Sequence, residues 1–283
     1  MSGKAMSLKA KLNNYAIKHH IAPQVVMQNY MFERFLLRLS QSPYRDQFVL
    51  KGGMLIASIV GLDTRSTMDL DATIRQLPLT EERLTEAILS ISNIESDDNI
   101  SFQFVSIAPI RDDDQYGGFR IRLNAIFETI VTPLSLDIST GDVITPRAMR
   151  YRFIGFLDNT LSFDLWGYNP ETILAEKVET ILRRGVLSTR PRDLYDVYIL
   201  SATQMINSET FAAALQATAK HRGSWTLIQD TAAILESLQN SSDQRAQWTK
   251  YQKKFSYATT ISYDDTLNAV RRLVLLEESC DNK

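Results

Sequence analysis

Two glycines and two aspartates form the first group of residues whose chemistry can be read from the sequence. Gly52 and Gly53 follow the short apolar run 48–50, and Asp69 and Asp71 come further along, with one residue between them. Glycine allows backbone amides to approach a phosphate closely. Mg²⁺ prefers oxygen ligands and usually takes only one or two carboxylates, with water and phosphate in its other positions. These residues therefore predict a site for a metal-bound phosphate.

The segment 68–75 alternates between apolar and polar residues, which is typical of a strand. In a strand, Asp69 and Asp71 point to the same side. Asp137, within the strand-like segment 133–139, is a candidate third carboxylate that could bind a second metal or activate an attacking hydroxyl. The alternative is that these acids are solvated residues on an open sheet face. For an isolated Asp-x-Asp that alternative is the stronger one, but the apolar opposite face and the preceding glycines favour a phosphate site.

Arg65 and Ser66 stand just before this strand. The arginine could contact a triphosphate, and the serine hydroxyl could assist it. They could equally belong to a polar loop in which Arg65 pairs with Asp63. The residues alone leave both interpretations open.

A second group of polar residues lies on two consecutive helix-like segments. Its members are Lys177, Thr180 and Arg184 on the segment 170–184, and Arg192, Asp193 and Asp196 on the segment 191–203. A lysine or arginine facing a metal-bound phosphate supplies charge where pyrophosphate leaves. Spacing alone nevertheless favours an ordinary ion pair between neighbouring helices, from Lys177 or Arg184 to one of the aspartates.

The order of the expected elements indicates an α/β protein. Helical patterns cover 5–20, 23–40, 54–60 and 80–94, and strand patterns dominate from about 101 to 165. Asp112 to Asp114, followed by Gly117 and Gly118, indicate an exposed hairpin connection. After Trp166 the pattern is helical, with helices expected at 170–184, 191–203, 208–221, 224–239 and 263–279. We therefore expect a mixed-sheet domain with flanking helices over 1–166 and an all-helical domain over 167–283.

Composition excludes several classes of protein. The 283 residues are 44% hydrophobic and 23% charged, as in ordinary globular domains, and the net charge of -2 gives no global signal for nucleic acid. One cysteine, Cys280, and three histidines argue against a His/Cys zinc site, and the lone cysteine favours a reducing cytoplasm. The sequence shows neither a signal-peptide pattern nor a stretch long and apolar enough to predict a membrane span.

Two stretches resemble motifs of a known family. LKGGMLIASIVGLDTRSTMDLD, residues 50–71, is similar to the first motif of the AbiEii family of abortive-infection nucleotidyltransferase toxins. AEKVETILRRGVLSTRPRDLYDVYIL, residues 175–200, resembles the later motif of that family. The order and spacing of the two stretches agree with the family, and the resemblance covers about residues 45–200.

The resemblance implies a nucleotidyltransferase fold, a helical domain, and an active site in the cleft between them that uses an NTP and magnesium. By motif match, the metal ligands are Asp69 and Asp71, and Asp193 is a further essential acid. The motif match makes Lys177 the NTP-contacting lysine, and we expect the other NTP-binding residues, from their positions in the sequence, to be Gly52, Gly53, Arg65, Ser66 and Arg184. The supporting residues are Asp137, Arg192 and Asp196. In the broader superfamily a serine stands at the position of Gly53, so the resemblance implies that one phosphate-contacting hydroxyl is absent.

The resemblance also implies a biological context. Members of the family are toxins countered by a separate antitoxin protein, and characterised relatives add nucleotides to the 3′ end of tRNA, which blocks translation. Basic candidates for an RNA surface are Lys4, Lys9, Lys11, Lys18, Arg147, Arg150, Arg152, Lys250, Lys253 and Lys254. The alternatives are a kinase with the same metal site, a non-catalytic nucleotide-binding or partner-binding module, and a structural role for all the acids as ion-pair partners.

Overall fold

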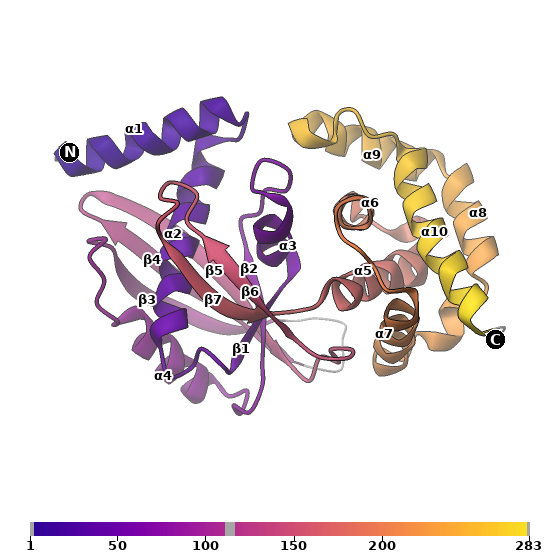
Figure 1. Ribbon diagram of the computed structural model, residues 1–283, viewed down its shortest axis with the longest axis horizontal. Coiled ribbons are helices and arrows are strands. Elements are labelled where there is room, and N and C mark those ends of the chain that lie inside the picture. Colours follow the sequence, from indigo (N-terminus) through magenta and orange to yellow (C-terminus); the bar gives the residue numbers. More distant parts are fainter. Residues whose placement is uncertain (1–2, 111–116, 282–283) are drawn as a thin grey trace. The chain divides into compact units, whose positions relative to one another are not determined.

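The structure, a computed structural model, describes residues 3–110 and 117–281 and is shown in Figure 1. Its chain divides into two compact units. The first contains residues 1–142 and 149–167, and the second contains 143–148 and 168–283. A single boundary after residue 166 does not describe this division, because the short segment 143–148 belongs to the second unit.

The first unit is built on a seven-stranded mixed sheet with the order β3-β4-β5-β2-β1-β7-β6. The strands are β1 Phe48–Lys51, β2 Leu70–Ile74, β3 Ser101–Ile110, β4 Gly118–Phe127, β5 Ile130–Thr140, β6 Met149–Ile154 and β7 Ser162–Gly167. The pairs β2–β5 and β1–β7 are parallel, and the other neighbours are antiparallel. The predicted α/β class with a mixed sheet is confirmed.

Four helices accompany this sheet, namely α1 Gly3–Lys18, α2 Pro23–Gln41, α3 Gly52–Val60 and α4 Glu81–Ser92. Helix α2 packs against β5 and β7, and α1 packs on α2 (Figure 1). The side chains of Phe32, Phe35 and Leu36 on α2 are buried. Because burial of such a side chain contributes roughly 1.5–3 kcal/mol, this helix anchors the sheet.

The alternation predicted for the segment 68–75 is present only at the start of β2, because Thr73, expected on the polar face, is buried. Leu70 and Ala72 are buried, whereas Asp71 between them is half-buried. The strand is shorter than predicted, because it begins at Leu70, so Asp69 precedes it. The helix after β1 begins earlier than predicted, and both glycines belong to its first turn.

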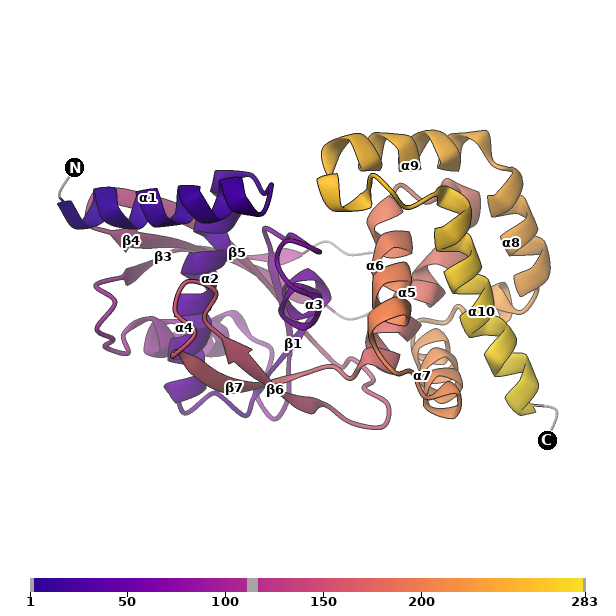
Figure 2. The same cartoon turned by 45° about the horizontal axis from the view of Figure 1, so that its top comes forward.

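The second unit contains the remaining helices (Figure 2). They are α5 Pro170–Arg184, η1 Gly185–Leu187, α6 Pro191–Thr203, α7 Ser208–His221, η2 Trp225–Ile228, α8 Thr231–Asn240, α9 Ser242–Lys254, η3 Ser256–Ala258 and α10 Tyr263–Asp281. Helix α5 starts as predicted: Asn169 accepts a hydrogen bond from the Thr172 N–H, and Pro170 is the first helical residue. Helix α9 was not predicted.

Two further expectations concern the chain as a whole. The proposed hairpin connection at Asp112 to Asp114 lies outside the described residues. Within the described part of the chain, none of the helices combines the length and apolar composition needed to cross a membrane.

Candidate active site

The tightest feature of the first unit is the turn from β1 into α3. Lys51 ends β1, and Gly52 follows with a φ of +63°, a conformation that side-chain-bearing residues rarely adopt. A Cβ on Gly52 would lie 2.1 Å from Oδ2 of Asp71. The Asp71 carboxylate therefore sits directly against the backbone at the start of α3, where only glycine leaves room for it.

The sheet register explains this proximity. Lys51 of β1 pairs with Asp71 of β2 in the antiparallel ladder, and Asp71 in turn pairs with Asp137 of the parallel strand β5. Neighbours in a register share a face of the sheet. Asp137 is thus the next residue beside Asp71, and Asp69 is an exposed residue immediately before β2.

Gly53 is also crowded, by residues of the loop that precedes β2. A Cβ on Gly53 would lie 2.7 Å from the Thr67 hydroxyl oxygen and 3.1 Å from Nη2 of Arg65. Both side chains are buried. The space that a serine side chain would take at position 53 is therefore already occupied by a hydroxyl and a guanidinium group, which the sequence did not reveal for Thr67.

Two amide side chains of α2 hold this loop in place. Asn29 donates to the Thr67 carbonyl over 2.8 Å, and Gln28 donates to the Met68 carbonyl over 3.0 Å. Arg65 donates to the carbonyl of Ser66, a buried residue. Oδ2 of Asp63, the alternative partner considered for Arg65, lies at hydrogen-bond distance, 3.2 Å, from Nδ1 of His19.

Asp137 is engaged by a residue that was not predicted. Arg120 of β4 donates from Nε to Oδ1 of Asp137 over 2.8 Å and from Nη2 to Oδ2 over 2.6 Å. The hydrogen bonds and charge of Asp137, together with the charges of Asp69 and Asp71, raise the pKa of Arg120 above its ordinary value. Arg120 is thus a fixed positive charge at the edge of the three carboxylates.

A second cation occupies the other end of the same row. Lys51 Nζ lies 2.7 Å from Oδ2 of Asp142 and 2.9 Å from the Ser139 hydroxyl. Asp71 therefore belongs to a row of four residues paired across neighbouring strands, namely Lys51, Asp71, Asp137 and Arg120. The two carboxylates lie in the middle of the row, and a cation stands at each end.

The carboxylates meet the requirements of a magnesium ion in part. Among residues 3–110 and 117–281, no group of three or more His, Cys, Asp and Glu side chains is arranged to hold a metal. Asp69 and Asp71 alone would leave most coordination positions for water and phosphate, which is the usual pattern for Mg²⁺. The glycine contact of Asp71 and the exposure of Asp69 fit such a two-carboxylate site.

The second predicted group lies within the second unit. Lys177 Nζ contacts Oδ1 of Asp193 over 2.6 Å and Oδ2 of Asp196 over 3.1 Å, and both aspartates are buried. The ion pair that spacing alone predicted for Lys177 is confirmed. Arg190 Nε also contacts Asp193, over 2.7 Å. The exposed Arg184 shows no ion pair with either aspartate in the part of the chain that the structure describes.

The environment keeps Asp193 ionised. Burial acts to raise its pKa, but the charges and hydrogen bonds of Lys177 and Arg190 outweigh this effect and lower the pKa. Arg192, one of the predicted supporting residues, is half-buried beside this cluster in sequence. The positive charges of Lys177 and Arg190 are therefore already paired with buried carboxylates.

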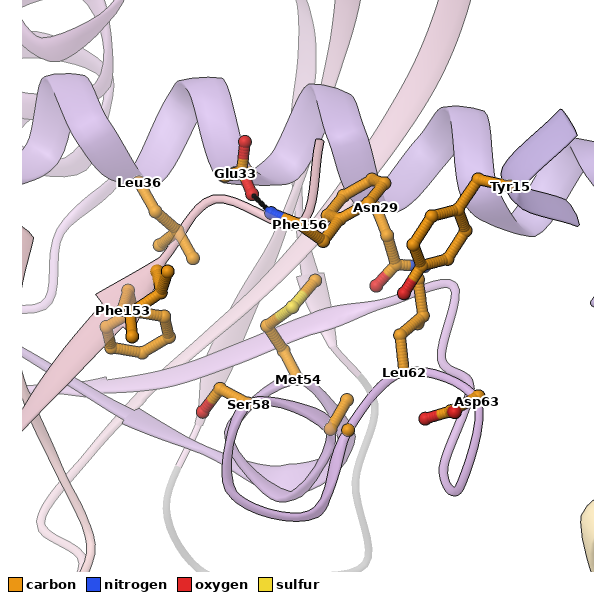
Figure 3. Close-up of a pocket in the computed structure, with 13 residues that line it drawn as sticks. Tyr15, Asn29, Glu33, Leu36, Met54, Ser58, Leu62, Asp63, Phe153 and Phe156 are labelled. Carbon is orange, nitrogen blue, oxygen red and sulfur yellow. Dashed lines mark hydrogen bonds between the residues drawn. The ribbon is translucent and has the colours of Figure 1, made fainter. Parts of the chain in front are cut away.

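A separate cavity of about 230 Å³ is bordered by α2, α3 and the end of β6 (Figure 3). It is lined mainly by apolar side chains such as Met54 and Phe156, and by Glu33, whose Oε2 accepts from the Phe156 N–H over 3.0 Å. Burial raises the pKa of Glu33. None of the predicted site residues lines this cavity, so it is distinct from the carboxylate row.

The comparison with protein families decides the assignment of the chain. A family model described as "Nucleotidyl transferase AbiEii toxin, Type IV TA system" matches residues 34–269. The chain belongs to the AbiEii family. The match extends well beyond the two stretches that carried the resemblance, and it spans both units of this AbiEii protein. Membership in a toxin–antitoxin family implies an antitoxin partner.

Solved structures agree with the fold of this AbiEii protein. JHP933 from Helicobacter pylori is similar with a TM-score of 0.54 and 17% identity, covering 92% of this chain and 95% of the other. A second H. pylori structure, of a candidate nucleotidyltransferase, gives a TM-score of 0.52 and 17% identity, with coverage of 93% and 98%. At such identities the likeness establishes the nucleotidyltransferase fold. A comparison with curated proteins gave no significant match.

Proposed function

We propose that this AbiEii protein is a magnesium-dependent nucleotidyltransferase that transfers a nucleotide from an NTP to the 3′ end of tRNA and so blocks translation. The observation that carries the proposal is the close contact between the Asp71 carboxylate and the backbone of Gly52. It brings a metal-binding carboxylate to the start of a helix, where backbone amides favour phosphate. The choice of tRNA as the acceptor rests on the family resemblance.

The proposed reaction is a displacement at the α-phosphorus of the NTP. An acceptor hydroxyl oxygen forms a bond to this phosphorus while the bond to the oxygen bridging to the β-phosphate breaks. Pyrophosphate leaves with the electron pair, and the hydroxyl proton passes to water. The attacking and leaving oxygens are roughly in line in such a displacement.

The proposed roles follow from the geometry of each residue. Asp69 and Asp71 would hold Mg²⁺, which when bound neutralises charge on the phosphate oxygens. The backbone at Gly52 and Gly53 would receive the β- and γ-phosphates, with the Arg65 guanidinium beside Gly53 as their counter-charge. Charged hydrogen bonds of this kind are roughly twice as strong as neutral ones.

The remaining assignments are proposed on motif match. Lys177 and Arg184 would contact the NTP, and Ser66 would assist through its hydroxyl. Asp193 would hold Lys177 in its working position, because the two side chains are 2.6 Å apart. Asp137 would act through Arg120 as part of a fixed charge pair, since both of its oxygens accept hydrogen bonds from that guanidinium.

Labelled nucleotides test the function directly. Purified protein is incubated with Mg²⁺, total RNA and each NTP carrying a label on the α- or the γ-phosphate. The proposal expects the α label alone to appear in RNA of tRNA size. Transfer of the γ label alone would identify a kinase, and magnesium-dependent NTP binding with no covalent product would identify a binding module.

A variant at the metal site ties the activity to the proposed residues. Asp69→Ala should abolish transfer without unfolding the protein, because Asp69 is exposed and makes no core contact. Glu82→Ala is a matched control, since it removes an exposed carboxylate on α4. Retained transfer in Asp69→Ala, with a melting temperature equal to that of the wild type, contradicts the metal assignment.

A further inference from the structure

A hollow of about 500 Å³ adjoins the carboxylates in the first unit, and we refer to it as the β4–β5 hollow. It is bordered by the first turns of α2, by Met68 and by the strands β4 and β5. The residues on which the argument depends are Gln24, Met68, Arg122, Asn124, Val131 and Ser135.

The hollow begins one residue from the proposed metal site. Met68 directly precedes Asp69, and its carbonyl accepts a hydrogen bond from the side-chain amide of Gln28 over 3.0 Å. The same amide donates to the Pro133 carbonyl of β5 over 3.2 Å. This buried amide therefore ties the Met68 loop to the edge of β5 and keeps the wall of the hollow in place.

The sheet register gives the direction in which the hollow extends. Arg122 of β4 pairs with Ser135 of β5, and the pair of Arg120 with Asp137 lies two residues away on each strand. Residues two apart on a strand face the same side and are separated by roughly 7 Å. The hollow thus continues the polar face of the carboxylate row along β4 and β5.

The hollow and the glycine turn lie on opposite sides of the strand that carries Asp71. In the sheet, β2 stands between β1, which leads into Gly52, and β5, which borders the hollow. The attacking and leaving oxygens of a phosphoryl displacement are on opposite sides of the phosphorus. If pyrophosphate leaves at the glycine turn, the acceptor hydroxyl has to arrive from the side of the hollow.

The lining has the chemistry of a nucleotide site. Met68 and Val131 expose apolar surface, with exposed fractions of 39% and 56%. A bulge in β3 between Phe104 and Ser106 accompanies a third exposed apolar residue, Val105, at 51%. Arg122 adds a positive charge to these apolar walls, and none of the described residues that line the hollow carries a carboxylate. In a chain of net charge -2, this lining is locally positive.

We propose that the β4–β5 hollow binds the terminal nucleotide of an RNA acceptor. Its base lies against Met68 and Val131, its phosphate contacts Arg122, and the amides of Gln24 and Asn124 face the base edge. This proposal rests on the proposed function, because it uses the position of the metal site to assign the hollow to the acceptor and not to the NTP.

Two variants and two controls test the site kinetically. Arg122→Gln removes the phosphate contact, and Val131→Glu introduces a carboxylate at an exposed position. Each should raise the KM for acceptor RNA about 10-fold while leaving the KM for the NTP unchanged. In addition, Arg122→Gln should reduce the slope of the logarithm of the RNA-binding constant against the logarithm of salt concentration by about 0.7. The matched changes Arg83→Gln and Leu89→Glu, at exposed positions of α4, should leave both KM values unchanged.

A crosslinking experiment reads the site without turnover. A short single-stranded RNA with a photoreactive 4-thiouridine at its 3′ end should crosslink to Met68 or Val131, as mapped by mass spectrometry. An unchanged acceptor KM in both variants, or crosslinks confined to other surfaces, overturns the proposal. A rise in the KM for the NTP in place of the acceptor KM assigns the hollow to the NTP base and also overturns it.

A wrong function and a wrongly assigned hollow give different experimental results. If wild-type protein labels no RNA with any NTP, the proposed function fails, whatever the crosslinking shows. If wild-type protein labels RNA normally but the variants behave as the controls do, only the hollow is misassigned.

Discussion

Replacing Gly52 by alanine tests whether the contact between the glycine turn and Asp71 matters for catalysis. A Cβ at this position would lie 2.1 Å from Oδ2 of Asp71, whereas ordinary contacts begin near 3.4 Å. The carboxylate would therefore have to retreat by about 1 Å, a displacement that can cost about 100-fold in rate when it misplaces a catalytic group. The φ of +63° adds a backbone strain of about 1 kcal/mol.

Gly223 provides a matched control for the strain. Its φ is +65°, and a Cβ there would meet no atom within 4 Å. Gly223→Ala should therefore carry the same strain without a collision. Both variants should melt a few degrees below the wild type, but only Gly52→Ala should lose about 100-fold in kcat/KM and need more Mg²⁺ for half-maximal transfer.

The comparison of these two variants can refute the reasoning in two ways. If Gly52→Ala retains the wild-type transfer rate, the contact between the Asp71 carboxylate and the glycine turn is not required for catalysis. If Gly223→Ala loses as much activity as Gly52→Ala, the loss reflects strain and not the position of the carboxylate. The assay is initial-rate transfer of α-labelled NTP, with thermal unfolding of the same samples.

Three further predictions follow from contacts described above. Gly53→Ser should lower the transfer rate at least 10-fold, because the Thr67 hydroxyl occupies the space that the new side chain needs. Adding Thr67→Ala should restore most of the lost rate. If the two substitutions instead lower the rate additively, the packing explanation is wrong. Lys177→Met should reduce the free energy of unfolding by about 3 kcal/mol in denaturant titrations, because it leaves buried carboxylates without the lysine charge. Adding Asp193→Asn should recover part of that stability without recovering transfer; no recovery would contradict the charge argument. Glu33→Gln should stabilise the protein more at pH 8 than at pH 4. The reason is that the pKa of Glu33 is raised in the folded state, so the wild type loses stability as the pH rises through this interval. An equal difference in the free energy of unfolding between variant and wild type at both pH values would show that Glu33 titrates normally.

Much of the architecture could be predicted because one face of each element is buried. The alternation around Asp71 predicted the two faces at the start of β2, and the bounds of α5 followed from the Asn169 cap and from Gly185. Helix α9 was missed because only Gln244, Trp248 and Tyr251 of its 13 residues are buried. So narrow a stripe gives no clear helical periodicity.

The Lys177 ion pair could be predicted from helical spacing, but the contacts across the sheet could not, because they depend on a strand register that the sequence does not reveal. The pairing of Arg120 with Asp137 depends on the hairpin between β4 and β5, in which Phe127 pairs with Ile130. Its turn contains Glu128 with a φ of +54° and no glycine or asparagine, so the usual sequence signal is missing. The position of Thr67 beside Gly53 depends on hydrogen bonds from a distant helix, which no local pattern encodes.

The segment 143–148 has a consequence for the order in which the chain can fold during synthesis. It belongs to the second unit, where the carbonyls of Thr145 and Arg147 accept hydrogen bonds from the Asn169 side chain, over 2.8 and 2.9 Å. The Thr145 N–H donates to the Thr172 hydroxyl over 3.0 Å. These partners leave the ribosome only after the strands β6 and β7 have been made.

The growing chain therefore has to complete the β6–β7 hairpin while the segment before it still lacks its partners. A protein cut after Gly167 would keep the segment 143–148 and lose Asn169 and Thr172, its hydrogen-bond partners. A chain that ends before Asn169 contains the segment 143–148 without the side chains that it contacts in the native protein.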